Sequence, residues 1–132
     1  MPNKSFSVRI KHKIKPFSKT IKVDSDKSLS IRSFLLGSIC QNISTVKNVL
    51  ESGDVKSAIK VCQKLGVVIK KIRPKSYKIY GKGLGSLYIK KNAELNFGNS
   101  GTLARLLLGI LSTTPNINIK IKGDHSLNKR SM

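Results

Sequence analysis

The sequence predicts a mixed α/β (α+β) fold, built from units with the element order β-α-β-α-β-β. Apolar residues change several times along the chain from alternation, which is typical of strands, to the three- and four-residue spacing of helices. Clusters of glycine, proline and serine mark these changes. A strand, a Gly- or Ser-containing loop and a helix follow one another near Val23 and again near Leu95, which indicates a repeated unit. With 132 residues and 39% hydrophobic content, the chain can bury one core of about domain size.

The N-terminal part is predicted to contain two short strands followed by a helix. Apolar and polar residues alternate over Phe6–Ile10 and again over Ile21–Val23. The period then changes, and helical spacing of the apolar residues predicts a helix over Ser28–Ile43, with Ser25 or Asp26 as its N-cap.

The middle of the chain is predicted to complete the unit. β-Branched residues indicate a short strand over Ser44–Val49. A second helix is predicted from Ser52 to Leu65, with an apolar stripe on one side and Gly66 as the stop signal. Further short strands are predicted at 67–72, 76–80 and 87–89, separated by glycine turns.

The last third is predicted to open another strand, loop and helix series. The loop Phe97–Thr102 leads from a strand into a leucine-rich helix, and Pro115 ends that helical region. Asn116–Lys122 alternates as a half-buried strand, and Gly123-Asp124 turns out of it into a polar loop that carries Arg130.

The chain is strongly basic, with 26 Lys and Arg against 6 Asp and Glu and a net charge of +20. Such a charge raises the question of a nucleic-acid partner. No RNP-like or helix-turn-helix pattern accompanies it, so specific nucleic-acid binding is not expected. A small basic module that binds RNA or another polyanion stays open as the alternative function, and it requires cations grouped on one face. An interaction protein is a third class, for which no motif speaks.

Neither a metal nor another cofactor is expected. Cys40 and Cys62 form no CxxC motif, and His12 and His125 lie far apart in the sequence. The N-terminus has no apolar signal region, and no apolar run approaches the ~18 residues of a membrane span. We therefore expect a cytoplasmic protein with reduced thiols and no membrane partner.

Three segments place small residues and cations where helices begin or strands end: Asp26–Arg32, Gly98–Arg105 and Gly123–Arg130. Free backbone N–H groups at such positions bind anions. The segments contain neither GxxxxGK[ST] nor GxGxxG, so neither an ATPase nor a Rossmann fold is indicated. The expected ligands are small, phosphorylated and anionic.

The side chains of the first segment offer three ways to hold an oxyanion. Lys27 brings a compact charge, Ser28 a neutral donor and Arg32 a bidentate fork, and the helix dipole adds to their attraction. An ordinary helix cap beside solvated cations is the other interpretation of this segment. Arg105 either contacts a ligand or is a solvated or ion-paired helix residue.

Taken in order, the three segments resemble the N-terminal part of the 5-enolpyruvylshikimate-3-phosphate synthase family, the 3-phosphoshikimate 1-carboxyvinyltransferases. The resemblance covers nearly the whole chain. It implies an enolpyruvyl transferase-like fold with two domains, each of three β-α-β-α-β-β units, so that residues 1–132 form a partial, incomplete domain. The UDP-N-acetylglucosamine enolpyruvyl transferases are a weaker match, since they have Asn where this chain has Ser28.

The resemblance implies transfer of the enolpyruvyl group of phosphoenolpyruvate to the 5-hydroxyl of 3-phosphoshikimate, with release of phosphate. It belongs to the shikimate pathway, which leads to chorismate and the aromatic amino acids, and a full-length member is expected to be a monomer. By similarity, Lys27 touches both substrates, Ser28 and Arg32 hold 3-phosphoshikimate, Gly101 and Arg130 hold phosphoenolpyruvate, and Asn99 shapes the loop around Gly101.

The chain departs from the family pattern in residues that shape loops. It has Asp24-Ser25 where Pro-Gly is usual, Ile31 where His or Asn is common, and Ser131 where Pro follows the arginine. Family members are far longer, and their acid and base carboxylates, remaining arginines and second domain follow the part that this chain resembles. We therefore expect a fragment that contributes binding residues and is inactive alone.

Overall fold

A computed structural model describes residues 7–9, 11–13, 15–90 and 93–131. Along the described chain the elements are α1 (Lys27–Ile39), β1 (Ile43–Lys47), α2 (Gly53–Lys64), β2 (Val68–Arg73), β3 (Ser76–Tyr80), β4 (Glu94–Asn96), α3 (Gly101–Leu111), β5 (Lys120–Lys122) and α4 (His125–Asn128). The order from α1 to β3 is α-β-α-β-β, so the predicted unit is confirmed from its first helix onward.

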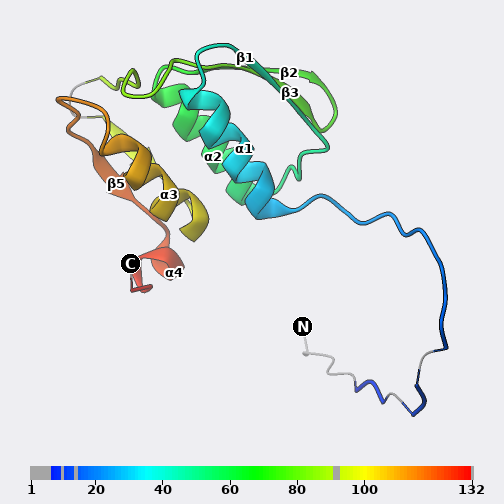
Figure 1. The fold of residues 1–132 in the computed structure, drawn as a ribbon. Helices are drawn as coiled ribbons and strands as arrows, with labels where there is room; N and C mark the ends of the chain where they lie inside the picture. Colours follow the sequence, from blue (N-terminus) through cyan, green and yellow to red (C-terminus); the bar gives the residue numbers. More distant parts are fainter. Residues whose placement is uncertain (1–6, 10, 14, 91–92, 132) are drawn as a thin grey trace.

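Strand β3 lies at the centre of an antiparallel sheet with the order β1-β3-β2. Helices α1 and α2 pack on one face of this sheet, and α3 packs against α1, away from the sheet (Figure 1). Strands β4 and β5 form a separate parallel pair, with Leu95 opposite Ile121. The described elements therefore form a layer of helices with the larger sheet on one side.

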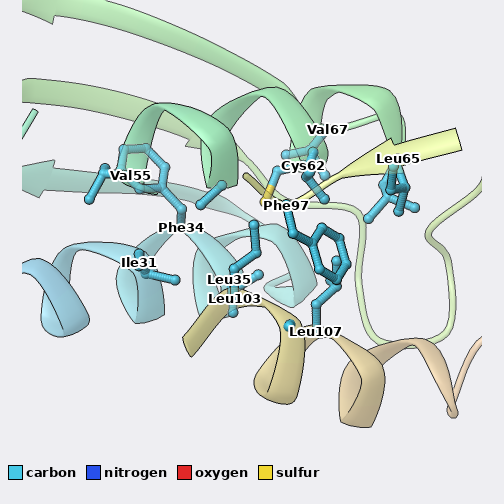
Figure 2. Close-up of a cluster of buried hydrophobic side chains, with 14 of the residues drawn as sticks. Ile31, Phe34, Leu35, Val55, Cys62, Leu65, Val67, Phe97, Leu103 and Leu107 are labelled. Carbon is cyan, nitrogen blue, oxygen red and sulfur yellow. The ribbon is translucent and has the colours of Figure 1, made fainter. Parts of the chain in front are cut away.

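The core lies between the three long helices and the sheet. Figure 2 shows Leu35 of α1, Cys62 of α2, Leu107 of α3 and Phe97 gathered between the helices, with Phe34 of α1 beside Val55 of α2. Phe34 also meets the ring of Tyr77 edge-on, with the ring centroids 5.3 Å apart. These side chains are buried, so removal of apolar surface from water holds the helices to each other and to the sheet.

Glu51 ties the loop before α2 to the sheet. Its Oε1 accepts hydrogen bonds from the hydroxyl of Tyr77 (2.6 Å) and from the backbone N–H of Lys75 (3.2 Å), and lies 2.8 Å from Nζ of Lys71. The bonds from Lys71 and Tyr77 lower the pKa of the Glu51 carboxyl to about 2. Burial, together with the same carboxylate, raises the pKa of the Tyr77 hydroxyl to about 12.

The prediction of two N-terminal strands is wrong where the structure describes that segment. Residues 15–26 form no strand and pair with no other strand, and Ile21 and Val23 are 75% and 72% exposed. Figure 1 shows this segment running away from the packed elements. Alternation marks a strand's two faces, but a strand forms only where a sheet edge pairs with it. Phe6 and Ile10 lie outside the described residues.

Three further segments differ from the predictions by more than two residues. Helix α1 ends at Ile39, because Cys40 is extended and Ile43 pairs with Tyr80 in the sheet. Residues 87–89 form no strand, although Leu87 is buried. Of the strand predicted over Asn116–Lys122 only the last three residues are paired, because β4 offers a ladder of three residues.

Candidate functional site

Asp26 begins α1 and places Lys27 and Ser28 in its first turn. The Oδ1 of Asp26 accepts a hydrogen bond from the N–H of Leu29 (2.6 Å), so Asp26 is the N-cap. Ser25, the other predicted cap, instead donates to the side-chain oxygen of Asn48 (3.0 Å). Two residues that were alternatives from sequence thus have separate roles.

Lys27 reaches across to the N-terminus of α2. Its Nζ lies 2.9 Å from Oδ2 of Asp54, in a pair that is partly exposed. Ser30 fixes the approach of the two helix ends, since its hydroxyl donates to the carbonyl of Asp26 (2.7 Å) and accepts from the N–H of Leu50 (3.0 Å). Lys27 is therefore held over the start of α2, and the interpretation as a freely solvated cation does not describe it.

Ser28 and Arg32 lie one turn apart on α1, which puts them on the same side of the helix. Arg32 is exposed and borders a groove of about 320 Å³ between α1 and α3, lined also by Leu36 and Leu106. Its guanidinium can therefore meet a ligand that approaches from solvent.

The loop between β4 and α3 is shaped by its own side chains. Oδ1 of Asn96 accepts from the N–H of Gly98 (2.9 Å), and Gly98 has φ +56°, a conformation that favours glycine. Ser100 caps α3, its hydroxyl oxygen accepting from the N–H of Leu103 (3.3 Å). Within the described chain, the N–H groups of Gly101 and Thr102 have no protein acceptor and are free for an anion.

The C-terminal segment brings Arg130 to this loop. The predicted polar loop contains the short helix α4, capped by Asp124, whose Oδ1 accepts from the N–H of Leu127 (2.8 Å). Leu127 is buried beneath Gly101 and Gly123. Beyond α4, Nη2 of Arg130 donates to Oδ1 of Asn99 at 2.6 Å.

Arg130, Arg105, Gly101 and Thr102 line an open cleft of about 290 Å³. A Cβ added to Gly101 would lie 3.2 Å from Nη1 of Arg130, so glycine leaves room for that guanidinium. Arg105 donates from Nη2 to the carbonyl of Ser131 (3.2 Å) and so braces the segment after Arg130. Two guanidinium groups and a helix N-terminus around one cleft suit a phosphate or carboxylate.

Helix α2 connects the two halves of the candidate site. Asp54 in its first turn pairs with Lys27, and Ser57, three residues later, lies beside Gly98, with its Oγ 3.1 Å from where a Gly98 Cβ would be. Residues three apart share one side of a helix. Lys27 and the loop of residues 97–100, called the glycine loop below, therefore contact the same face of α2.

Sequence reasoning assigned no supporting role to Asp54, Ser57 or Leu127. The helix dipole alone explains an acidic residue in the first turn of α2. Asp54 therefore gave no sequence signal of its pairing with Lys27. Leu127 could have been found as the one apolar residue of a segment that begins with a capping aspartate. Among the described residues, no hydrogen bond or ion pair joins Lys27 or Ser28 to Arg130.

The part of the chain that the structure describes lacks two further kinds of site. No group of three or more His, Cys, Asp or Glu side chains there is placed to hold a metal ion. In the same ranges, no helix has the length and apolar content needed to cross a membrane.

Comparison with known proteins gives one consistent family. The sequence model of EPSP synthase (3-phosphoshikimate 1-carboxyvinyltransferase) matches residues 11–132. The 3-phosphoshikimate 1-carboxyvinyltransferase of Oceanobacillus iheyensis is 45% identical over 113 residues, which are 86% of this chain and 26% of that protein. The protein of the same name from Alkaliphilus oremlandii is 42% identical over 122 residues, 92% of this chain and 28% of that one.

Solved structures agree with the sequence comparisons. An EPSP synthase from Acinetobacter baumannii superposes with a TM-score of 0.76 at 36% sequence identity, over 85% of this chain and 25% of that one. The chain thus spans about a quarter of the length of the relatives that it matches.

Proposed function

This chain belongs to the EPSP synthase family, and we propose that it forms the part of a 3-phosphoshikimate 1-carboxyvinyltransferase that holds the two anionic substrates. In the proposed reaction the 5-hydroxyl oxygen of 3-phosphoshikimate bonds to C2 of phosphoenolpyruvate. The bond from C2 to the phosphate oxygen breaks, phosphate leaves, and the hydroxyl proton passes to a base.

One observation supports the proposal above the others: Arg130 and the N-terminus of α3 face one cleft, and Asn99 orients the arginine. A guanidinium binds phosphate or carboxylate through two parallel hydrogen bonds. The free N–H groups of Gly101 and Thr102 add donors that need no reorganisation. We assign phosphoenolpyruvate, which carries both kinds of anionic group, to this cleft.

We assign 3-phosphoshikimate to the side of α1 that carries Ser28 and Arg32. Lys27 starts the same helix, and its pairing with Asp54 directs the ammonium group toward α2 and the glycine loop beside it. A cation there would reduce the repulsion between two anions bound side by side. This is the role that family resemblance suggests for Lys27 with both substrates.

The proposed acid and base are not assigned to this chain. Its carboxylates are Asp24, Asp26, Glu51, Asp54, Glu94 and Asp124, and none of them lines the cleft of Arg105 and Arg130. We therefore propose that these 132 residues bind substrates but do not turn them over alone. We also propose a monomer in the cytoplasm, where thiols such as the free Cys40 and Cys62 stay reduced.

The test is phosphate release from phosphoenolpyruvate and 3-phosphoshikimate by the longest polypeptide that the open reading frame encodes. We expect phosphate release that requires both substrates. The rate should fall at least about a hundredfold in Lys27→Ala and in Arg130→Ala, because each substitution removes one group that stabilises the transition state. The matched variants Lys56→Ala and Arg73→Ala should keep full activity. Release that is unaffected by Lys27→Ala and Arg130→Ala would contradict the proposal.

A further inference from the structure

The face of the β1-β3-β2 sheet that points away from the helices has a composition of its own. In β3, Tyr77 and Ile79 are buried against the helices, and Lys78 between them is exposed. Because side chains alternate along a strand, Lys78 points from the opposite face. Figure 1 shows this face on the outside of the layer formed by α1 and α2, away from α3.

Lysines lie side by side across this face. Lys78 pairs in register with Lys70 of β2 and with Thr45 of β1, and all three are exposed. Two residues along β3 from Lys78, Ser76 pairs in register with Lys47 of β1 and Arg73 of β2, and both of these cations are exposed. The sequences of the three strands contain no Asp or Glu. Like charges directly opposite each other destabilise a sheet, so a bound polyanion would relieve this arrangement.

A row with an aromatic ring follows the lysine row on the same face. Tyr80 lies in register between Ile43 and Val68, which are 56% and 49% exposed. Nζ of Lys70 lies 5.6 Å from the centroid of the Tyr80 ring. The face therefore offers cations for a phosphate backbone next to an apolar row with a ring on which a base can stack.

We propose that this outer sheet face, defined by Lys47, Lys70, Arg73, Lys78 and Tyr80, binds single-stranded nucleic acid. The lysines contact phosphates and the Tyr80 ring stacks on a base. The Tyr80 ring in its apolar row favours an unpaired strand over a duplex, whose bases are stacked on each other. The face lies across the helix layer from the Arg130 cleft, so the inference does not depend on the proposed function.

The experiment measures binding of a fluorescein-labelled oligouridine of about 12 nucleotides to this chain by fluorescence anisotropy, from about 50 to about 200 mM KCl. The Lys70→Gln/Lys78→Gln variant should bind about tenfold more weakly, with a salt slope shallower by about 1.4 for two lost phosphate contacts. Tyr80→Leu should weaken binding about fivefold through lost stacking. Lys70→Arg/Lys78→Arg keeps both charges and should bind like the parent.

The matched control removes the same charge from α2, on the other side of the sheet. Lys56→Gln/Lys60→Gln changes two exposed lysines and should leave the affinity within about twofold. Equal losses in the two glutamine variants would overturn the proposal, since any surface charge would then serve. It is also overturned if a duplex binds as tightly as the single strand, or if polyglutamate of equal charge displaces the oligouridine as well as unlabelled oligouridine does.

Discussion

Arg130 donates a hydrogen bond from Nη2 to the side-chain oxygen of Asn99 at 2.6 Å, across 31 positions of sequence. This bond joins two of the three segments for which we predict anion binding. An arginine on an exposed segment samples many rotamers, and a fixed acceptor reduces the entropy that a ligand must otherwise remove. We therefore predict that Asn99 positions the guanidinium of Arg130.

The first prediction concerns that bond. Asn99→Ala should weaken phosphoenolpyruvate binding about tenfold, because a hydrogen bond to a charged group contributes about 1.5 kcal/mol. The change is measured as the dissociation constant from amide shifts of Gly101 and Thr102 during titration. Asn128→Ala, which removes an asparagine whose side chain donates to the carbonyl of Gly123, is the control and should leave the constant unchanged. Equal effects of the two substitutions would contradict the positioning role.

A second prediction separates space from stability at the start of α3. In Gly101→Ala the new methyl group would lie 3.2 Å from Nη1 of Arg130 and displace the guanidinium, so phosphoenolpyruvate affinity should fall at least fivefold, about 1 kcal/mol. The fold should persist, since the contact is the end of a flexible side chain. Gly109→Ala in the same helix meets nothing within 4 Å and should stabilise the protein by about 0.5–1 kcal/mol without altering binding. The titration measures the affinity of each variant, and thermal unfolding measures its stability.

The third prediction tests Asp54 as the partner of Lys27. Asp54→Asn should change the free energy of unfolding by less than about 1 kcal/mol, because the pair is partly exposed. Catalytic efficiency of the full-length protein should nevertheless fall about tenfold, because the ammonium group loses its direction. In a Lys27→Ala background the same substitution should have little further effect, and full additivity of the two changes would disprove the coupling. Asp24→Asn removes an equal charge from the segment before α1 as the control.

The fourth prediction is a dependence of stability on pH through Glu51. The folded pKa of the Glu51 carboxyl is about 2, below its ordinary value of 4.5. Its stabilising contribution is therefore present above pH 4.5 and is lost as the pH falls toward 2. Tyr77, raised from 10 to about 12, stabilises the fold below pH 10 and loses this contribution as the pH rises to 12. Melting temperatures of the parent should fall in both windows. Glu51→Gln should flatten the acid window, and a parallel acid decline in that variant would refute the assignment.

Local sequence signals were sufficient to predict an element whose own residues mark its first residue, its apolar face and its end. Helix α2 was predicted from Ser52, its apolar stripe and Gly66, and it runs from Gly53 to Lys64 with Gly66 at φ +86°. Strand β3 was predicted with both boundaries correct. In these segments helix or strand propensity, apolar patterning and capping favour the same structure, so tertiary packing keeps the local preference.

The errors arise where an element depends on a partner. Ile21 and Val23 alternate as a strand does, yet no sheet edge in the described chain pairs with them. Leu29 and Leu106 fit the helical stripes but are 63% and 39% exposed, because periodicity gives a face and not what covers it. The pairing of Lys27 with Asp54 follows from the packing of α1 on α2, which no local pattern encodes.

The single turn of α2 between Asp54 and Ser57 sets the phase between two motifs that lie far apart in the sequence. Three residues of helix advance about 4.5 Å along the axis, and one inserted residue rotates everything after it by about 100°. An insertion or deletion between Asp54 and Ser57 would therefore move one of these two residues to a different side of the helix. Lys27 would then lose its partner Asp54, or Gly98 would lose its neighbour Ser57. Length variation should be tolerated in the loop of residues 81–90 but not here, although neither Asp54 nor Ser57 lines the cleft of Arg105 and Arg130.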